Sequence, residues 1–161
     1  MSSTPTTRST TALRLVLIVL GALSAFVAIN VAFGGLETLG LQGPTDYVRV
    51  TDPAAYAIRD SHARYYGGVY LALGLFLVYA SRDLPRFRAT LQVVFAMIFA
   101  GGLARLSQGD LGVTFGSDLA VSTLIELVGI PALAVWVHRA TRPVAVATAL
   151  PGAGGVVAHA A

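Results

Sequence analysis

The sequence predicts an all-α fold, a four-helix transmembrane bundle with an extracytoplasmic loop between the first and second helices. Of the 161 residues, 55% are hydrophobic and only 12% are charged, whereas an ordinary soluble domain is about 25% charged. The few charges separate four long apolar runs, which lack the alternation of barrel strands and exceed their length of about 9–11 residues. Because a backbone inside a bilayer must satisfy its own hydrogen bonds, helices are the expected solution.

The composition also excludes several classes of protein. The 11 basic residues are all arginine, the net charge is only +3, and the arginines are scattered rather than gathered in a stripe, which argues against nucleic-acid binding. The chain has no cysteine, so disulfides and thiolate metal sites are ruled out. There is no glycine-rich phosphate loop or Gly-x-Ser-x-Gly elbow, and the three histidines lie on different segments. We therefore expect no catalytic residue, no cofactor and no metal site.

The apolar runs have the length of membrane spans, for which about 20 residues are needed, with a range of about 17–25. Three uncharged runs of 22, 17 and 16 residues cover 15–36, 65–81 and 89–104, and the 20 residues 119–138 hold one charge, Glu126. A single membrane domain, residues 13–141, is therefore predicted. Its helices are expected at about 13–34, 61–81, 86–106 and 119–138.

The segments outside these helices are short. Residues 1–12 are rich in serine and threonine, and the tail 142–161 contains proline and several glycines, so both are predicted to be disordered. The outer loop is predicted at 35–60. Within it, Asp52 precedes Pro53, an N-cap followed by proline at the first helical position. The second helix therefore has an alternative start at residue 53.

The arginine distribution predicts the orientation. With the N-terminus inside, seven arginines and one acid lie on the inner side, and four arginines lie on or border the other side, which is a positive-inside bias. Both termini are thus expected in the cytoplasm. The use of arginine without lysine, with much alanine and glycine, indicates a bacterium, so the predicted location is the bacterial inner (plasma) membrane.

Four polar residues do not fit a role in setting orientation. Glu126 lies about 11 Å into the fourth helix, where a charge costs several kcal/mol unless it is paired, hydrated or neutralised. In the predicted topology each of the other helices also places one polar residue in the same outer third. The candidate intramembrane polar cluster is therefore Asn30, Arg64, Arg105 and Glu126.

Three interpretations of this cluster are open. It could be an internal ion network that fixes helix register, with Asp60 or Asp110 balancing the charge. It could be a polar cavity open to the outer side that binds a lipid headgroup, a carboxylate or a quinone oxygen, since the planar arginine fork suits such groups. It could also be a proton relay through Glu126. Loss of function in Glu126→Gln at an unchanged protein level would argue against the first.

The polar residues lie in motifs that resemble a known family. Residues 64–74 (RYYGGVYLALG), residues 101–106 (GGLARL) and Glu126-Leu127 are similar to the domain-of-unknown-function 4345 family, small bacterial four-pass integral membrane proteins. The resemblance covers about residues 15–140. It implies a compact four-helix membrane bundle with Arg64, Arg105 and Glu126 as its marked positions, and it implies no activity.

Three functions are consistent with these features. The small size and the glycines on the helices, which allow close helix packing, favour a non-enzymatic accessory or structural subunit of a membrane complex. Its partners would be the lipid bilayer and another membrane protein or a second copy of the chain. The alternative is a small lipid- or quinone-binding or transport protein that uses the outer polar site. A membrane enzyme is the third hypothesis.

Overall fold

The computed structural model describes residues 5–38 and 52–142, and within them it is helical with no strand. The predicted all-α fold class is confirmed for this part of the chain. The elements are α1 (Pro5–Gly34), the 3-10 turn η1 (Gly35–Glu37), α2 (Pro53–Ala80), α3 (Leu84–Leu106), α4 (Leu111–Thr114), α5 (Ala120–Leu124), the π-helical turn η3 (Ile125–Gly129) and α6 (Ile130–Ala140).

Three helices in the described part of the chain are long and apolar enough to cross a membrane: Ser9–Glu37, Leu84–Leu106 and Ala120–Ala140. Helix α2 is not among the three. Its first turns carry charged residues, among them Arg59, Asp60 and Arg64, and an uncharged stretch follows up to Ala80.

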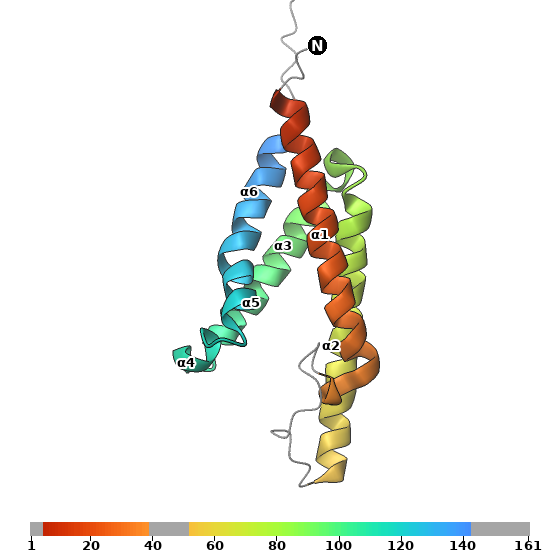
Figure 1. The fold of residues 1–161 in the computed structure, drawn as a ribbon, viewed down its shortest axis with the longest axis vertical. Coiled ribbons are helices and arrows are strands. Elements are labelled where there is room, and N and C mark those ends of the chain that lie inside the picture. Colours follow the sequence, from red (N-terminus) through yellow and green to blue (C-terminus); the bar gives the residue numbers. More distant parts are fainter. Residues whose placement is uncertain (1–4, 39–51, 143–161) are drawn as a thin grey trace, which may run out of the picture.

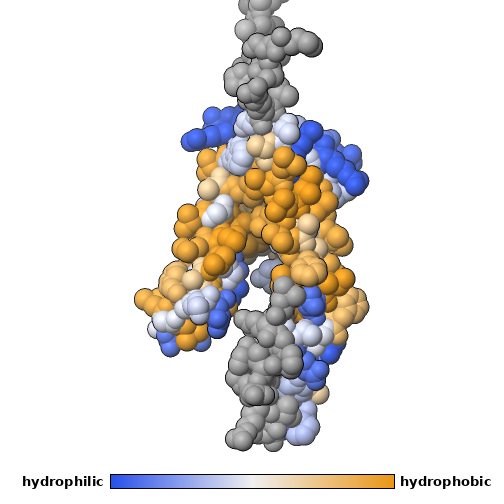
Figure 2. Space-filling view, in the orientation of Figure 1, coloured by the Kyte–Doolittle hydropathy of each residue, from blue (hydrophilic) through white to orange (hydrophobic). Residues whose placement is uncertain are grey.

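The long helices form two arms. Helices α1 and α2 lie side by side and antiparallel in one arm, and α3 packs with α6 in the other. Figure 1 shows that the arms meet where α1 begins, α2 turns into α3 and α6 ends, and that they diverge toward α4. The buried core lies near this junction, and hydrophobic residues gather over the middle of both arms between hydrophilic ends (Figure 2). Core residues from every long helix include Leu13, Leu17, Leu77, Leu84, Leu91, Phe95, Ile130 and Val137.

Helix α1 begins earlier than predicted. It starts at Pro5 rather than at residue 13, so residues 5–12, expected to be disordered, are helical. Proline favours the first position of a helix, and the indole of Trp136 in α6 donates a hydrogen bond of 3.0 Å to the Ser9 hydroxyl. Residues 1–4 and 143–161, also predicted to be disordered, lie outside the described residues.

Helix α2 begins at Pro53, the alternative start. The Asp52 side chain accepts hydrogen bonds from the backbone N–H groups of Ala54 and Ala55, at 2.9 and 3.2 Å. Part of the segment assigned to the outer loop is therefore helical, and residues 39–51 of that loop lie outside the described residues. Helix α3 starts at Leu84, where the Asp83 side chain accepts from the Arg86 N–H at 3.2 Å.

The helix predicted over 119–138 is interrupted by the π-helical turn. Pro131 has no N–H, so the normal bond to the Leu127 carbonyl is missing. The chain accommodates this with a bond from the Ile130 N–H to the Ile125 carbonyl, five residues earlier. This turn contains Glu126, and π-helical turns are frequent at functional sites.

Glycines allow the two helices of the first arm to approach closely. A Cβ atom on Gly67 would lie 2.8 Å from the Ala32 Cα, and one on Gly74 would lie 2.7 Å from the Ala25 backbone nitrogen. Real Cβ atoms essentially never make such contacts. Helices α1 and α2 thus touch backbone to backbone, as small residues permit in membrane proteins.

Candidate functional site

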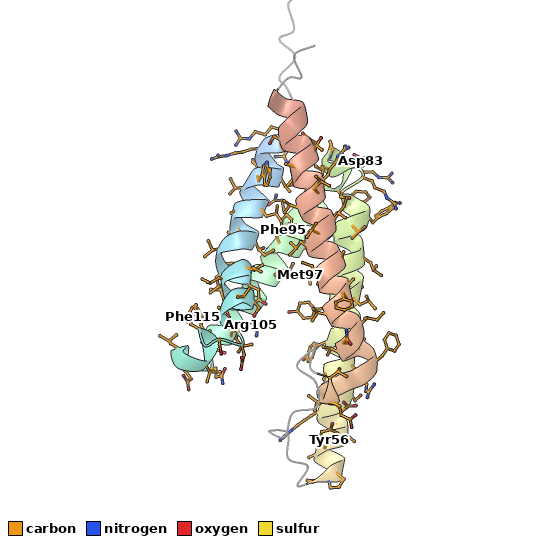
Figure 3. All side chains as sticks on the ribbon, viewed as in Figure 1. Tyr56, Asp83, Phe95, Met97, Arg105 and Phe115 are labelled. Atoms are coloured by element: carbon orange, nitrogen blue, oxygen red, sulfur yellow. The ribbon has the colours of Figure 1, made fainter. Side chains whose placement is uncertain are left out.

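Arg105 and Glu126 form a two-bond ion pair between the two helical segments of the second arm. The Arg105 Nε donates to Glu126 Oε2 at 2.7 Å, and Nη2 donates to Oε1 at 3.0 Å. The Arg105 side chain is 35% exposed and that of Glu126 is 14% exposed. Figure 3 labels Arg105 near the diverging end of this arm. A parallel pair of charged hydrogen bonds fixes both the distance and the orientation of the two groups.

Close packing and a buried hydroxyl set the position of Glu126. A Cβ on Gly102 of α3 would lie 2.8 Å from the Glu126 Cβ, so the π-helical turn rests directly on α3. One turn earlier, the fully buried Thr123 hydroxyl donates to the Thr114 carbonyl at 3.1 Å, which holds α4 against α5. The carboxylate therefore faces the end of α3, where Arg105 lies.

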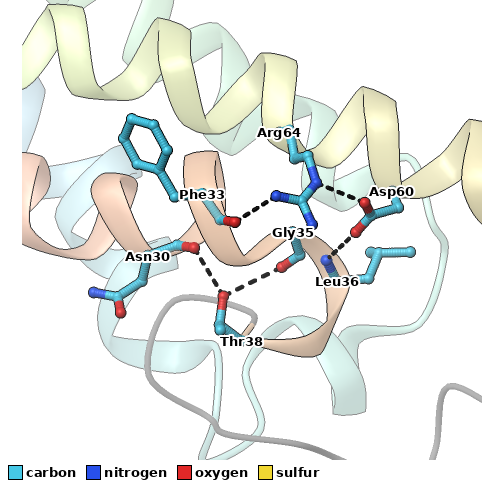
Figure 4. A network of polar contacts seen from close by, with 7 residues as sticks. All are labelled: Asn30, Phe33, Gly35, Leu36, Thr38, Asp60 and Arg64. Carbon is cyan, nitrogen blue, oxygen red and sulfur yellow. Dashed lines mark hydrogen bonds and ion pairs between the residues drawn. The ribbon is translucent and has the colours of Figure 1, made fainter.

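Arg64 belongs to a second network, in the first arm (Figure 4). Its Nε donates to Asp60 Oδ2 at 2.6 Å, and its Nη1 donates to the Phe33 carbonyl at the end of α1. The other Asp60 oxygen accepts from the Leu36 N–H at 2.8 Å. The pair thus satisfies a carbonyl at the end of α1 and an N–H at the start of η1, groups that helix ends leave without helical partners.

Asn30 completes neither ion pair. Its side-chain nitrogen donates to the Phe26 carbonyl of its own helix at 2.8 Å, and its backbone carbonyl accepts from the Thr38 hydroxyl at 2.9 Å. Of the four candidate residues, the structure joins Arg105 to Glu126 directly and places Arg64 with Asp60. The Asp60–Arg64 pair has the i,i+4 spacing of a helical ion pair, a signal that is readable in the sequence.

The second network predicts a small loss of stability in acid. Asp60 lies outside the predicted span 61–81, and the hydrogen bonds from Arg64 and then from the Leu36 N–H lower its pKa below the usual 3.8. The ionised Asp60 carboxylate therefore stabilises the fold above about pH 3.8, and this stabilisation is lost as the pH falls through the lowered pKa of Asp60. Because Arg64 is well exposed, we expect less than about 1 kcal/mol.

The measurement is thermal unfolding in detergent between pH 7 and pH 2.5. At pH 7 the Asp60→Asn variant should have a lower melting temperature than wild type, and the two melting temperatures should converge in acid. Asp118→Asn is the control, since within the described residues the side chain of Asp118 makes a single hydrogen bond, which it accepts from the Ser117 hydroxyl. Parallel curves for wild type and Asp60→Asn down to pH 2.5 would contradict the assignment.

A cleft of about 540 Å³ separates the two arms. Among the described residues that line it, Arg105 and Glu126 are the only charged ones, and most of the others are apolar. Its lining comprises Leu20, Leu23, Ser24, Val27, Ala28 and Val31 of α1, Ala63, Tyr66, Gly67, Tyr70, Leu73, Gly74 and Leu77 of α2, Ile98 and Arg105 of α3, Ser122 of α5, Ile125 and Glu126 of η3, and Ile130 of α6. The site is an apolar hollow with one ion pair in its wall.

Tyr70 reaches across this cleft from the first arm. Its hydroxyl lies 3.7 Å from where a Cβ on Gly101 would be, one turn before Arg105 on α3. Together with the hydroxyl of Ser122, it places hydrogen-bonding groups near the ion pair. Within the described residues no group of three or more histidine, cysteine, aspartate or glutamate side chains is arranged to hold a metal ion.

The match to a family model covers this whole arrangement. The model for a domain of unknown function, DUF4345, matches residues 12–137. The chain belongs to the DUF4345 family. The predicted family is thus confirmed, and the matched region of this DUF4345 chain contains both ion pairs and the cleft. Comparison with curated proteins and with solved structures gave no match.

Proposed function

We propose that this DUF4345 protein is a non-enzymatic, multi-pass membrane protein that holds one amphipathic molecule, such as a lipid or a quinone, in the cleft between its arms. The cleft is the observation that carries the proposal. Its volume of about 540 Å³ falls within the range of about 300–1,000 Å³ that is usual for small-molecule sites. Its apolar lining suits a hydrocarbon tail, and the ion pair offers hydrogen bonds to a polar head.

The course of the chain supports four passes. Helix α1 runs from the junction of the arms to the diverging end, and α3 starts again at the junction. If α1 and α3 cross the membrane, α2 must return across it, and its 28 residues span about 42 Å. Arginines gather at the junction, which favours a cytoplasmic location for that end and for both termini in a bacterial inner membrane. By their places in the helices they include Arg14 in the first half of α1, Arg82 between α2 and α3, Arg86 and Arg88 at the start of α3, and Arg139 at the end of α6.

The accessory-subunit hypothesis rested partly on glycines available for packing against another protein. Gly67, Gly74 and Gly102 instead make close contacts inside this chain, so the cleft is the stronger argument. If the protein were an accessory subunit, a helix of its partner would occupy the cleft. The enzyme hypothesis finds little support, because the described residues lining the cleft include serines and no histidine that could act as their base.

Native mass spectrometry after mild detergent extraction tests the proposal. Val27 lines the cleft and is 40% exposed, whereas Ile29 is 45% exposed on the same helix and does not line it. We expect wild type and the control Ile29→Trp to retain one amphiphile per chain, and Val27→Trp to lose it because the indole projects into the cleft and obstructs it.

Equal retention in Val27→Trp and Ile29→Trp would contradict the binding site. Absence of any small-molecule adduct from all three proteins would contradict the proposed function. If wild type instead retains a polypeptide that Val27→Trp releases, the accessory role would replace the proposed function.

A further inference from the structure

We infer that the cleft selects a molecule whose head is uncharged and accepts hydrogen bonds, such as a carbonyl oxygen, over a molecule with an anionic head. The inference rests on the proposed binding function and adds the chemistry of the ligand. It follows from the pairing of Arg105 with Glu126, from the hydrogen-bond donors that remain, and from the apolar lining beyond them.

The charge of the site is the first argument. A lone arginine in an apolar cleft would attract a carboxylate or a phosphate. Here Glu126 already occupies two donors of Arg105, and no other charged residue of the described chain lines the cleft. The wall is therefore neutral overall. An anionic head would either displace Glu126 or lie beside it, and each arrangement leaves one carboxylate or anion without a partner in a region of low polarity.

The remaining donors are the second argument. A guanidinium group has five N–H donors, and Glu126 takes one from Nε and one from Nη2. Within the part of the chain that the structure describes, three donors therefore remain, on a side chain that is 35% exposed. The Tyr70 hydroxyl adds another donor. It reaches from α2 to Gly101, which lies one turn of α3 before Arg105. A neutral acceptor can use these donors without disturbing the ion pair.

The apolar part of the cleft fixes where the tail lies. Along α2 the lining continues from Tyr70 through Leu73 to Leu77, next to the buried core, a rise of about 10 Å. Ile98 and Ile130 line it from the second arm. A molecule with its head at Arg105 would thus extend its tail toward the junction of the arms.

The test compares heads of different charge on similar tails, by isothermal titration calorimetry of the protein in phosphatidylcholine nanodiscs with empty nanodiscs as the blank. The uncharged probes are a decyl-substituted benzoquinone and dioctanoylglycerol, and decyl sulfate is the anionic probe. At least one uncharged probe should bind wild type tenfold or more tightly than decyl sulfate does. Which uncharged probe binds distinguishes a quinone from an ester lipid as the source of the carbonyl.

Glu126→Gln tests the cause of this selectivity. It leaves Arg105 without its counter-charge, so we expect decyl sulfate to bind at least tenfold more tightly than it binds wild type. Asp118→Asn is the matched control, because it makes the same change in charge at a carboxylate that does not line the cleft, and it should leave all affinities unchanged.

Two outcomes overturn the inference but leave the proposed function intact. In the first, decyl sulfate binds wild type as tightly as the uncharged probes do, and Val27→Trp abolishes that binding. In the second, Glu126→Gln keeps the wild-type preference for uncharged probes over decyl sulfate. If no probe binds wild type differently from Val27→Trp, the proposed function fails as well. The wild-type comparison stands even where a variant does not fold.

Discussion

Alanine substitutions at two adjacent glycines of α2 are expected to change stability in opposite directions. A Cβ on Gly67 would lie 2.8 Å from both the Ala32 Cα and the Val31 carbonyl carbon, and these backbone atoms of α1 cannot move without separating the helices. A Cβ on Gly68 meets nothing within 4 Å. Overpacking costs about 1–3 kcal/mol, and we expect Gly67→Ala to reach the upper end. Gly68→Ala should gain up to about 1 kcal/mol from helix propensity.

Thermal unfolding in dodecyl maltoside, followed by circular dichroism at 222 nm, measures both variants. The two residues are neighbours on one helix and undergo the same substitution, so propensity and detergent effects are matched. A melting temperature that falls equally in both would show that α1 does not approach α2 at Gly67.

Breaking the Arg105–Glu126 pair is the second large effect. Removing one partner of a buried pair costs about 3–5 kcal/mol, whereas replacing both by apolar residues is often neutral. Because Arg105 keeps 35% of its side-chain surface exposed, we expect about 3 kcal/mol for Arg105→Leu or Glu126→Leu. The double variant should regain most of that loss.

A double-mutant cycle in the same detergent measures this coupling. The double variant also separates the two roles of the pair, because it should restore stability while losing the preference for a carbonyl head over a hydrocarbon of equal length. A double variant as unstable as the sum of the two single ones would mean that the side chains do not act as a pair.

The sequence predicted the helices well where a single local signal decided them. Uncharged runs located α1 and α3, and the Asp52-Pro53 capping signal marked an alternative start of α2 that the structure uses. Pro131 has no N–H to donate, but the π-helical turn that results depends on how the neighbouring carbonyls find new partners. Helix α4 is too short for any periodicity, although Asp110 caps it by accepting from the Val113 N–H at 3.1 Å.

The site was harder to predict than the helices. Membrane depth alone brought Asn30, Arg64, Arg105 and Glu126 to one level, but helix rotation and packing decide which of them meet. Gly102 permits the approach that pairs Glu126 with Arg105, whereas Arg64 finds Asp60 one turn away on its own helix. The cleft depends on the angle between the arms, which no local sequence pattern encodes.

Photolabelling in native membranes tests most directly whether the cleft between the arms is a binding site. The probe is a decyl-substituted benzoquinone with a diazirine in the middle of its tail, and labelled peptides are identified by mass spectrometry. We expect labelling at lining residues such as Leu73 and Ile98, abolished by an excess of the probe without diazirine. If the label is found instead on exposed residues outside the cleft, such as Val93 and Val135, and the excess does not reduce it, the cleft is not a binding site.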